Sequence, residues 1–282
     1  MKNLAALLLT MVISMILPAQ GVAGDWKSIK IATEGAYPPW NLIDSSGNLT
    51  GFEIDLANDL CRRMNVDCEI VATKWRGIID GLIKGRYDVI MAGMSITDAR
   101  KKLVSFSHSY AETPARLVVR KDNPTANFSL ELERLTLDDI SPAEQAALDA
   151  IIKELKGKVI GVQVATTHAK FADHFLGDHA EIRIYDFQHT IDLELYQGRL
   201  DALIGGVAYW MPMIKSEQGK DYKMVGPFMT GGPFGKGVGA AVRKKDKDLT
   251  DMFSRAIEET IKDGNLKKLA IKWFTFDASA QE

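Results

Sequence analysis

The sequence predicts an α/β protein in which a mostly parallel sheet is covered by helices on both faces. Residues 29–92 alternate between short apolar segments, typical of buried strands, and amphipathic segments, typical of helices. The same alternation resumes after residue 116, so we expect a second unit of the same kind. Ligands bind to such sheets beyond the carboxyl ends of the strands, so the loops that follow the strands are the first candidates for a site.

The first unit begins with a predicted strand at residues 29–33. Consecutive prolines, Pro38 and Pro39, then predict a loop, because proline cannot donate a ladder hydrogen bond. Residues 51–65 are predicted to form a helix, because apolar side chains recur there at helical spacing: Phe52, Leu56, Leu60 and Met64.

Two more strands and a helix complete this unit. Residues 68–72 and 87–92 are predicted strands, and residues 75–84 form an amphipathic helix between them. The three loops that follow the strands begin near Thr33, Thr73 and Gly93. They are expected to converge on one cleft, because the carboxyl ends of parallel strands share one edge of a sheet.

The second unit contains predicted strands at 116–120, 158–162 and 200–204. Residues 124–156 are polar and helical in character, and Ser141 followed by proline is typical of a helix start. The loops at about 163–168 and 205–209 follow two of the strands and are expected to face the first cleft.

A helix is predicted from about Thr167 to Leu176, and backbone amides at a helix N-terminus favour an anion. The chain then passes through a glycine-rich stretch at 226–239 and ends with an amphipathic helix before Trp273.

The run from Ile90 to Arg100 is the most informative segment for chemistry. A buried strand ends there in small residues, Ala92 and Gly93, which leave backbone polar groups open to a ligand. Ser95 adds a hydroxyl, and Arg100 adds a planar fork that can bind a carboxylate through two hydrogen bonds. The alternative is a core strand followed by an unrelated surface arginine.

The N-terminus predicts export. Lys2 precedes the apolar run Leu4–Leu17, and small residues follow up to Ala23, which is typical of a signal peptide cleaved after residue 23. The run is shorter than the roughly 20 residues that span a bilayer. No cysteine follows at a lipid-attachment position, so we expect a soluble periplasmic protein.

Only two cysteines are present, Cys61 and Cys68, so a single intramolecular pairing exists. In an oxidising compartment they should form a disulfide that closes a short loop, worth roughly 2–3 kcal/mol in the chain-entropy model. Two cysteines without a nearby histidine give no metal-ligand set, so we predict no metal site. The spacing is not that of a Cys-x-x-Cys redox pair.

Charge and length limit the possible functions. Without the 23 leader residues the chain would hold about 259 residues, enough for two lobes, with 34 basic and 37 acidic side chains and a net charge of −3. No basic block appears, which argues against nucleic acid as a partner.

These motifs resemble the polar amino-acid group of extracytoplasmic solute-binding proteins that serve ABC importers, known as family 3, over essentially the whole mature chain. Glu34 and the cysteine pair resemble lysine/arginine/ornithine and histidine binders. The insertion at 127–156 and the loops at 33–35 and 226–232 resemble octopine and nopaline (opine) binders more closely. The stretches that carry the family resemblance are 36–40, 51–56, 88–90, 95–100, 198–202 and 263–266.

The resemblance implies the type II periplasmic-binding-protein-like fold, with two α/β lobes joined by two crossings near 111–116 and 234–238. Lobe 1 would comprise residues 24–112 and 237–282, and lobe 2 residues 113–236. The lobes would close over a small-molecule ligand, an amino acid or opine, which a membrane permease of the importer would receive. We expect a monomer without cofactor.

The resemblance also implies a role for each site residue. Arg100 would pair with the ligand carboxylate, and Ser95 and the amides near Thr166 would bond to it. Tyr37 and Trp75 would sandwich the ligand side chain, by cation–π contact for a guanidinium. Glu34 would take a basic distal group. The full predicted set is Glu34, Tyr37, Trp75, Ala92, Gly93, Ser95, Arg100, Ala165, Thr166, Thr167 and Gly206.

Alternatives stay open for three of these residues. Tyr37 and Trp75 could simply pack in the core. Glu34 could be a solvated loop acid.

Gly206 departs from the family pattern. Amino-acid binders usually carry an aspartate there to neutralise the α-ammonium, whereas Asp201 resembles a different, structural aspartate of the strand. Breaking a buried charge pair costs on the order of 2–5 kcal/mol, and Gly205 and Gly206 make room. The departure therefore favours a bulkier or N-substituted ligand, such as an opine of arginine.

Two rival classes remain. Exported enzymes of this fold that resemble cyclohexadienyl dehydratase also lose that aspartate, but an enzyme needs a poised acid or base. Glu34 and His168 are the only candidates, neither with an evident activating partner, and His168 could equally face solvent; no catalytic residue is predicted. A binding module that feeds a membrane receptor would use the same cleft.

Overall fold

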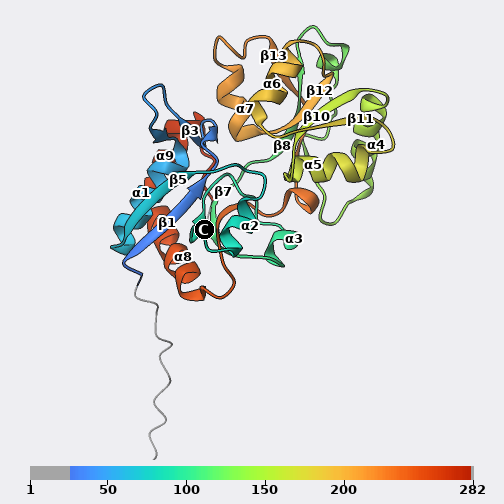
Figure 1. Ribbon diagram of the computed structural model, residues 1–282. Helices are drawn as coiled ribbons and strands as arrows, with labels where there is room; N and C mark the ends of the chain where they lie inside the picture. Colours follow the sequence, from blue (N-terminus) through green and yellow to red (C-terminus); the bar gives the residue numbers. More distant parts are fainter. Residues whose placement is uncertain (1–25, 281–282) are drawn as a thin grey trace, which may run out of the picture.

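A computed structural model describes residues 26–280 and shows two α/β units, each built on its own sheet (Figure 1). The predicted signal peptide, residues 1–23, lies outside the described residues. The α/β class and the two-unit organisation predicted from the sequence are confirmed.

The first sheet has the strand order β5-β1-β6-β14-β7. Its strands are β1 (Ser28–Thr33), β5 (Asp67–Ala72), β6 (Val89–Ile90), β7 (Ser105–Ala111) and β14 (Val238–Val242). The unit also holds α1 (Phe52–Met64), α2 (Ile78–Ile83), α3 (Asp98–Lys101), α8 (Lys247–Lys262) and α9 (Asn265–Phe274). A small sheet accompanies it, made of β2 (Ala36–Tyr37), β3 (Asn41–Ile43) and β4 (Leu49–Thr50).

The second sheet has the order β11-β10-β12-β8-β13-β9. Its strands are β8 (Ala115–Arg120), β9 (Arg134–Thr136), β10 (Val159–Gln163), β11 (Glu181–Tyr185), β12 (Ala202–Gly206) and β13 (Tyr222–Thr230). Its α-helices are α4 (Pro142–Leu155), α5 (Thr167–Phe171), α6 (Gln188–Tyr196) and α7 (Val207–Ile214). Three short helical segments are η1 (Pro124–Asn127), η2 (Ala172–Leu176) and η3 (Gly232–Phe234).

Most strands of each sheet run in one direction, as predicted, and one strand in each sheet runs against the others. Strand β1 pairs in parallel with β5 and β6, as the βαβαβ pattern indicates, but β14 runs antiparallel to β6 and β7. In the second sheet β8 runs antiparallel to β12 and β13. The two reversed strands, β8 and β14, each follow directly after a passage between the units.

The chain passes between the sheets twice, at residues 112–114 and 231–237. These passages overlap the crossings expected near 111–116 and 234–238. The division into lobes at 112/113 and 236/237 stays a prediction.

The helix predicted at 75–84 is shorter than expected. It begins only at Ile78, because Gly77 is in the left-handed region with φ 83°. Trp75 therefore lies in the loop before the helix instead of on its apolar face. The predicted strand at 87–92 pairs only over Val89–Ile90, and the residues after it turn toward the second unit.

The predicted helix start at Ser141 is confirmed. The Ser141 side chain accepts a hydrogen bond from the Glu144 amide, and the Glu144 carboxylate accepts from the Ser141 amide, which completes a capping box. Apolar side chains of α4 then pack against the second sheet.

The Cys61–Cys68 disulfide is present, with 6.2 Å between the Cα atoms. It joins the last turn of α1 to the start of β5.

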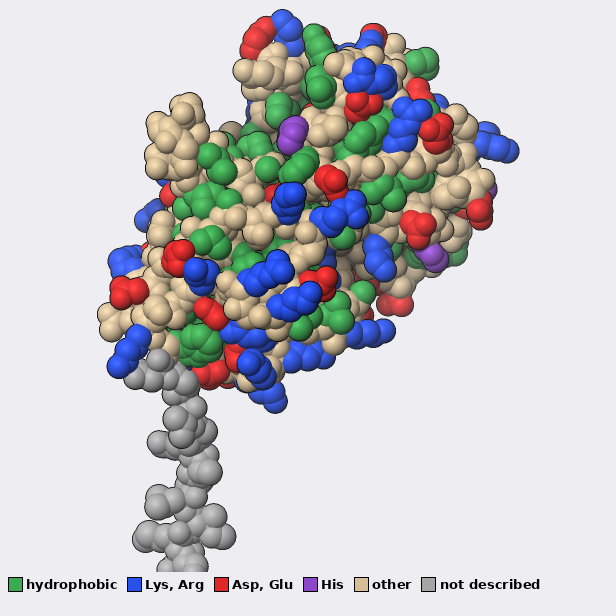
Figure 2. Space-filling model, viewed as in Figure 1, with side chains coloured by type: hydrophobic (Ala, Val, Ile, Leu, Met, Phe, Trp, Pro, Cys, Tyr) green, Lys and Arg blue, Asp and Glu red, His purple; other side chains and the backbone are tan. Residues whose placement is uncertain are grey.

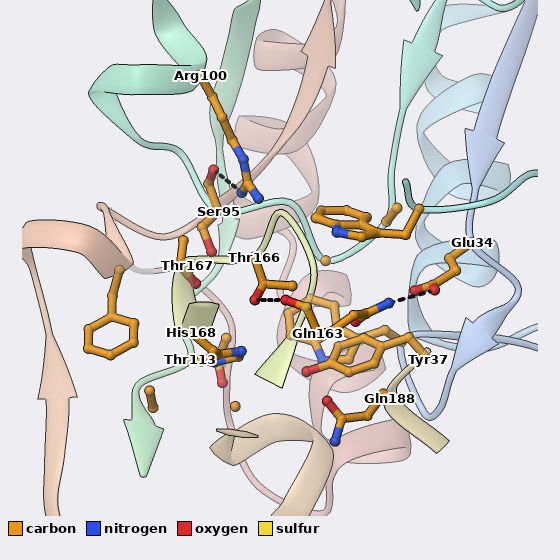
Figure 3. Close-up of a pocket in the computed structure, with 17 residues that line it drawn as sticks. Glu34, Tyr37, Ser95, Arg100, Thr113, Gln163, Thr166, Thr167, His168 and Gln188 are labelled. Atoms are coloured by element: carbon orange, nitrogen blue, oxygen red, sulfur yellow. Dashed lines mark hydrogen bonds between the residues drawn. The ribbon is translucent and has the colours of Figure 1, made fainter. Parts of the chain in front are cut away.

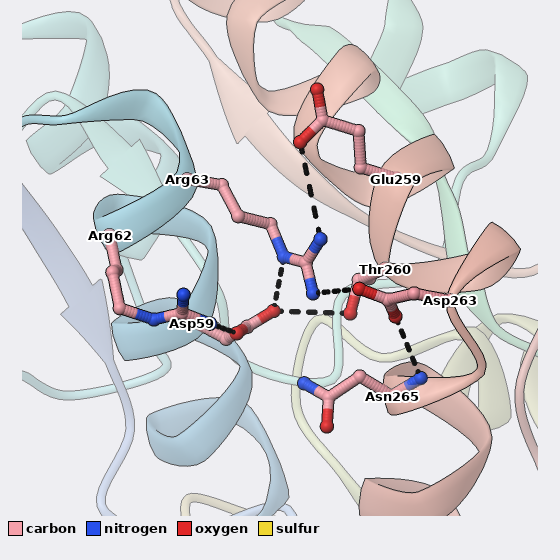
Figure 4. A network of polar contacts seen from close by, with 7 residues as sticks. All are labelled: Asp59, Arg62, Arg63, Glu259, Thr260, Asp263 and Asn265. Atoms are coloured by element: carbon pink, nitrogen blue, oxygen red, sulfur yellow. Dashed lines mark hydrogen bonds and ion pairs between the residues drawn. The ribbon is translucent and has the colours of Figure 1, made fainter.

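A buried carboxylate ties α1 to the C-terminal helices (Figure 4). Asp59 accepts hydrogen bonds from Arg63 Nε at 2.6 Å and from Thr260 Oγ1 of α8 at 3.1 Å. Arg63 also donates to Asp263, which follows α8. The residues that end the chain are thereby fixed to the unit that begins it.

Among the described residues, no helix is long and apolar enough to cross a membrane. Figure 2 shows Lys, Arg, Asp and Glu side chains mixed over the visible face, in keeping with the nearly balanced charge of the sequence.

Candidate ligand-binding site

The two units meet around a cavity whose lining encloses about 630 Å³, part of it open to solvent (Figure 3). Ten of the eleven predicted ligand-binding residues line it: Glu34, Tyr37, Trp75, Ala92, Gly93, Ser95, Arg100, Thr166, Thr167 and Gly206. Ala165 is not part of the lining, because its side chain is exposed and only its carbonyl turns toward Arg100. Their roles toward a ligand stay predictions.

Arg100 bridges the two units. Its Nη1 donates to the Ser95 carbonyl at 2.9 Å, and its Nη2 donates to the Ala165 carbonyl at 3.1 Å. Burial lowers its pKa to about 10, so the guanidinium stays protonated at neutral pH. Since guanidinium has five N–H donors, donors remain for a ligand.

A short helix fixes the position of Arg100. Thr97 caps α3 by accepting a hydrogen bond from the Arg100 amide at 3.2 Å, so the backbone of the arginine is held one turn beyond Ser95. The side chain then passes the Trp75 ring, with 5.3 Å between the guanidinium carbon and the ring centroid.

Glu53 supports the floor of the cavity, although the sequence analysis assigned it no role. Its buried carboxylate accepts the Gly93 amide and the Asn41 side chain, each at 2.7 Å, and the Tyr110 hydroxyl. Gly93 has φ 60°, a conformation that suits glycine. A buried acid inside an amphipathic helix pattern was the available signal.

Glu34 is 8% exposed, so the alternative of a solvated loop acid is wrong. Burial raises the pKa of Glu34 from 4.5 to about 7. The hydrogen bond from Gln163 acts to lower this pKa, whereas the negative charge of nearby Glu53 raises it further. The Gln163 bond, 2.9 Å from Nε2 to Oε1, joins the two units. A cation that enters the cavity can pair with this buried carboxylate.

The two aromatic rings line the cavity but are also held by the protein. Tyr37 stacks on Tyr209, with centroids 4.9 Å apart and planes 19° apart, and burial raises its pKa. Trp75 Nε1 donates to the Val164 carbonyl of the second unit at 2.9 Å. The core-packing alternative is therefore partly right, and the sandwich of a ligand side chain stays a prediction.

The loop after β10 supplies the second unit's side of the site. Thr166 caps α5 by accepting from the Ala169 amide at 3.1 Å, and its hydroxyl donates to the Gln163 carbonyl at 2.7 Å. The preceding residue, Ala165, has φ 57°, an unusual conformation for a residue with a Cβ.

His168 lines the cavity and does not face solvent. Burial, together with the positive charge of Arg100, lowers its pKa to about 4, so the imidazole is neutral at pH 7.

Gly206 ends β12 beside Tyr37. A Cβ at this position would lie 3.3 Å from the Tyr37 hydroxyl and 3.6 Å from Thr113 Oγ1, so a small side chain would fit only tightly. Asp201 lies at the other end of this strand, where it accepts the Val159 amide at 2.9 Å, and it is not part of the cavity.

Sequence reasoning missed six further lining residues. Gln163 and Gln188 are buried amides, and the other four are apolar or small. Apart from Gln163, which ends β10 in a loop that was expected to face the cleft, they come from segments without a strand-end motif: Trp40, Thr113, Ala115, Gln163, Gln188 and Phe234.

Besides these contacts, an exposed ion pair joins the units at the cavity rim, with 2.7 Å between Arg76 Nε and Asp186 Oδ1. Together with the Glu34–Gln163, Trp75–Val164 and Arg100–Ala165 bonds, it holds the units in a closed arrangement.

Residues 29–276 match the family described as bacterial extracellular solute-binding proteins, family 3. The chain belongs to this family. An octopine-binding periplasmic protein of Rhizobium meliloti is 35% identical to it, over 94% of this chain and 96% of that protein. The resemblance read from the sequence motifs is thus confirmed.

Solved structures agree with this assignment. An ancestral arginine-binding protein bound to arginine superposes with a TM-score of 0.72 at 32% identity, over 88% of this chain and 98% of that one. An ancestral amino-acid-binding protein described as a precursor of cyclohexadienyl dehydratase gives a TM-score of 0.71 at 29% identity, over 88% and 96%. That precursor is itself described as an amino-acid-binding protein.

Proposed function

We propose that this protein is the periplasmic binding component of an ABC importer and that it takes an arginine-derived amino acid or opine. The observation that carries this proposal is the cavity with a half-buried cation, Arg100, and a buried acid, Glu34, on different sides (Figure 3). A ligand with a carboxylate at one end and a guanidinium at the other complements both charges.

The aromatic rings of Tyr37 and Trp75 lie between these charged groups and suit the flat face of a guanidinium. Apart from Glu34, no acid lines the cavity within the described residues, so the wall offers one negative charge. A free arginine and an opine both bring two cationic groups, a guanidinium and an ammonium, but the opine adds at least one carboxylate, which lowers its net charge from +1 to zero or below. This charge count, with the octopine-binding relative, supports the opine.

The partner and compartment follow from the family and from the N-terminal sequence. The predicted signal peptide would deliver the protein to the periplasm, where a permease of the importer would receive the ligand when the units open. We propose a monomer, since the site is completed by one chain.

One observation favours a second candidate, an enzyme resembling cyclohexadienyl dehydratase. Glu34, with a pKa of about 7, is poised for proton transfer at neutral pH. Its side-chain partner within the described residues is the Gln163 amide, which orients the carboxylate but cannot carry a proton onward. Among the described residues no second acid lines the cavity, and we therefore rank this candidate below binding.

Isothermal titration of the refolded mature protein tests the proposal, because refolding removes any ligand that co-purifies. Octopine, nopaline, arginine, lysine and histidine are titrated in turn. Tight binding of at least one guanidinium ligand is expected, and Arg100→Gln should weaken it by roughly a hundredfold, since a charge-assisted pair is lost. Arg183→Gln, on exposed strand β11, is the matched control and should bind like the wild type.

Heat only from prephenate-like substrates, with product formation, would instead establish the enzyme. Equal binding by Arg100→Gln would contradict the carboxylate clamp.

A further inference from the structure

The cavity wall lacks an anion for the ligand's amino group, but a carboxylate lies one layer behind it. Asp192 of α6 does not line the cavity. Its Oδ1 accepts a hydrogen bond from Gln188 Nε2 at 2.8 Å, and its Oδ2 accepts from the Tyr209 hydroxyl. Within residues 26–280 no lysine or arginine forms an ion pair with it, so neutral donors alone hold this charge.

Gln188 connects Asp192 to the cavity. Its side chain is 4% exposed, lines the cavity, and comes from the first turn of α6. A carboxylate only accepts hydrogen bonds, so Asp192 forces the NH₂ group of Gln188 toward itself. The carbonyl oxygen must then face the cavity, as Figure 3 shows, and no donor in the described part of the chain bonds to it.

The space around residue 206 accounts for the position of Asp192 behind the cavity wall. Tyr37 stacks on Tyr209, the residue that donates to Asp192, and its hydroxyl lies 3.3 Å from where a Cβ of Gly206 would be. A carboxylate built on residue 206 would have to share this space with the Tyr37 hydroxyl. The negative charge is instead carried by Asp192 on α6, behind Gln188.

We propose that Gln188 and Asp192 form the subsite for the ligand's amino nitrogen. The Gln188 carbonyl oxygen accepts a hydrogen bond from the ammonium, and Asp192 is a positioning residue that fixes the amide and supplies the balancing negative charge. This inference rests on the proposed function, namely an amino-acid-derived ligand. A single neutral acceptor suits a secondary ammonium, with two N–H groups, better than a primary one with three.

The test compares two probes on the full-length mature protein: arginine and guanidinopentanoate, its analogue without the amino group. The ratio of their dissociation constants reports the amino group alone. The wild type should prefer arginine, and Asp192→Asn should reduce that preference roughly tenfold, as expected for loss of a charge-assisted hydrogen bond. Gln188→Met removes the acceptor and should have the same effect.

Glu194→Gln is the matched control, because this acid lies on the same helix but is paired with Arg199 on the outside. Its ratio should equal that of the wild type. A merely structural Asp192 would weaken both probes equally, and an unchanged ratio in Asp192→Asn or a wild-type ratio near one overturns the inference. If the wild type binds neither probe and also fails to bind octopine and nopaline, the proposed function itself is contradicted.

Discussion

At the scale of single residues, we propose that Gly206 selects the ligand class. A Cβ there meets the Tyr37 hydroxyl at 3.3 Å, which the ring can accommodate by a shift of a few tenths of an ångström. Gly206→Asp would place a carboxylate beside the proposed amino subsite. We expect it to tighten arginine binding and to weaken octopine binding, because the new side chain pairs with a primary ammonium and fills the space of an N-substituent.

Titration of both ligands against wild type and Gly206→Asp measures this exchange of preference. Gly206→Ala serves as the control, since it adds bulk without charge and should weaken octopine only. A parallel gain for both ligands in Gly206→Asp would argue against an N-substituted natural ligand.

Glu34 predicts a pH dependence of stability in the absence of ligand. Burial raises the pKa of its carboxyl from 4.5 to about 7, so the folded state favours the protonated form. Its contribution to stability is complete below pH 4.5 and is lost as the pH rises toward 7. Glu34→Gln should therefore match the wild type at pH 4 and exceed it at pH 8 by on the order of 1–3 kcal/mol.

Denaturant unfolding of unliganded wild type and Glu34→Gln at both pH values checks this expectation. If the unfolding free energies of wild type and Glu34→Gln differ by the same amount at pH 4 and pH 8, ionisation of Glu34 does not destabilise the folded protein. Ligand binding should show the opposite ranking of the two proteins. Glu34→Gln should bind a cationic ligand more weakly than the wild type at pH 8, because the negative charge that complements the ligand is gone.

At the scale of elements, the Asp59 network holds α1 to α8 and to the residue after it (Figure 4). Burial alone would raise the pKa of Asp59, but the hydrogen bond and charge of Arg63 lead the effects that lower it. Asp59→Asn removes the buried anion that pairs with Arg63 Nε and should destabilise the protein by about 2–4 kcal/mol. Thermal unfolding is measured for this variant and for Asp251→Asn, which removes the charge of an exposed acid of α8. A loss of stability in Asp59→Asn alone assigns the effect to the Asp59 network and not to the change in net charge.

The disulfide makes a second prediction at this scale. It closes a loop of seven residues between α1 and β5. Replacing both cysteines by serine should cost about 2–3 kcal/mol of unfolding free energy without altering the binding ratio of octopine to arginine. Urea unfolding and titration of the double variant check the two parts separately, and a changed ratio would mean that α1 transmits strain to Gly93 through Glu53.

The elements that the sequence predicted best have strong local signals. The period of apolar residues in α1 and the Ser141 capping box place these helices correctly. Strand β13 was missed because Gly226 and Pro227 interrupt it, and the structure absorbs them in a register shift between Val225 and Met229. Short strands such as β9 owe their existence to pairing partners far away in the sequence, which no local pattern contains.

The site shows the same division. Residues in strand-end loops, such as Glu34 and Ser95, could be predicted because parallel strands bring those loops together. Gln188 could not, because it begins a helix of weak amphipathic character and does not follow a strand end directly. Glu53 and Asp192 act from behind the wall; Glu53 was marked only by its place in an amphipathic helix pattern, and nothing in the sequence around Asp192 marks it.

At the scale of the whole molecule, closure depends on a few polar contacts between the units. Arg76 and Asp186 are exposed at the rim, and their pairing contributes little by itself. The buried contact from Gln163 to Glu34 also competes with a ligand cation for the same carboxylate. We infer that a bound ligand replaces part of this contact when the units close around it.

The central claim is that a ligand lies between the two units with its carboxylate on Arg100. A crystal structure of the refolded protein soaked or co-crystallised with octopine tests it most directly. The account predicts a ligand carboxylate within hydrogen-bond distance of Arg100 and Ser95, the guanidinium between Tyr37 and Trp75, and the amine at Gln188. A ligand bound in the reverse direction, with its carboxylate away from Arg100, would contradict it.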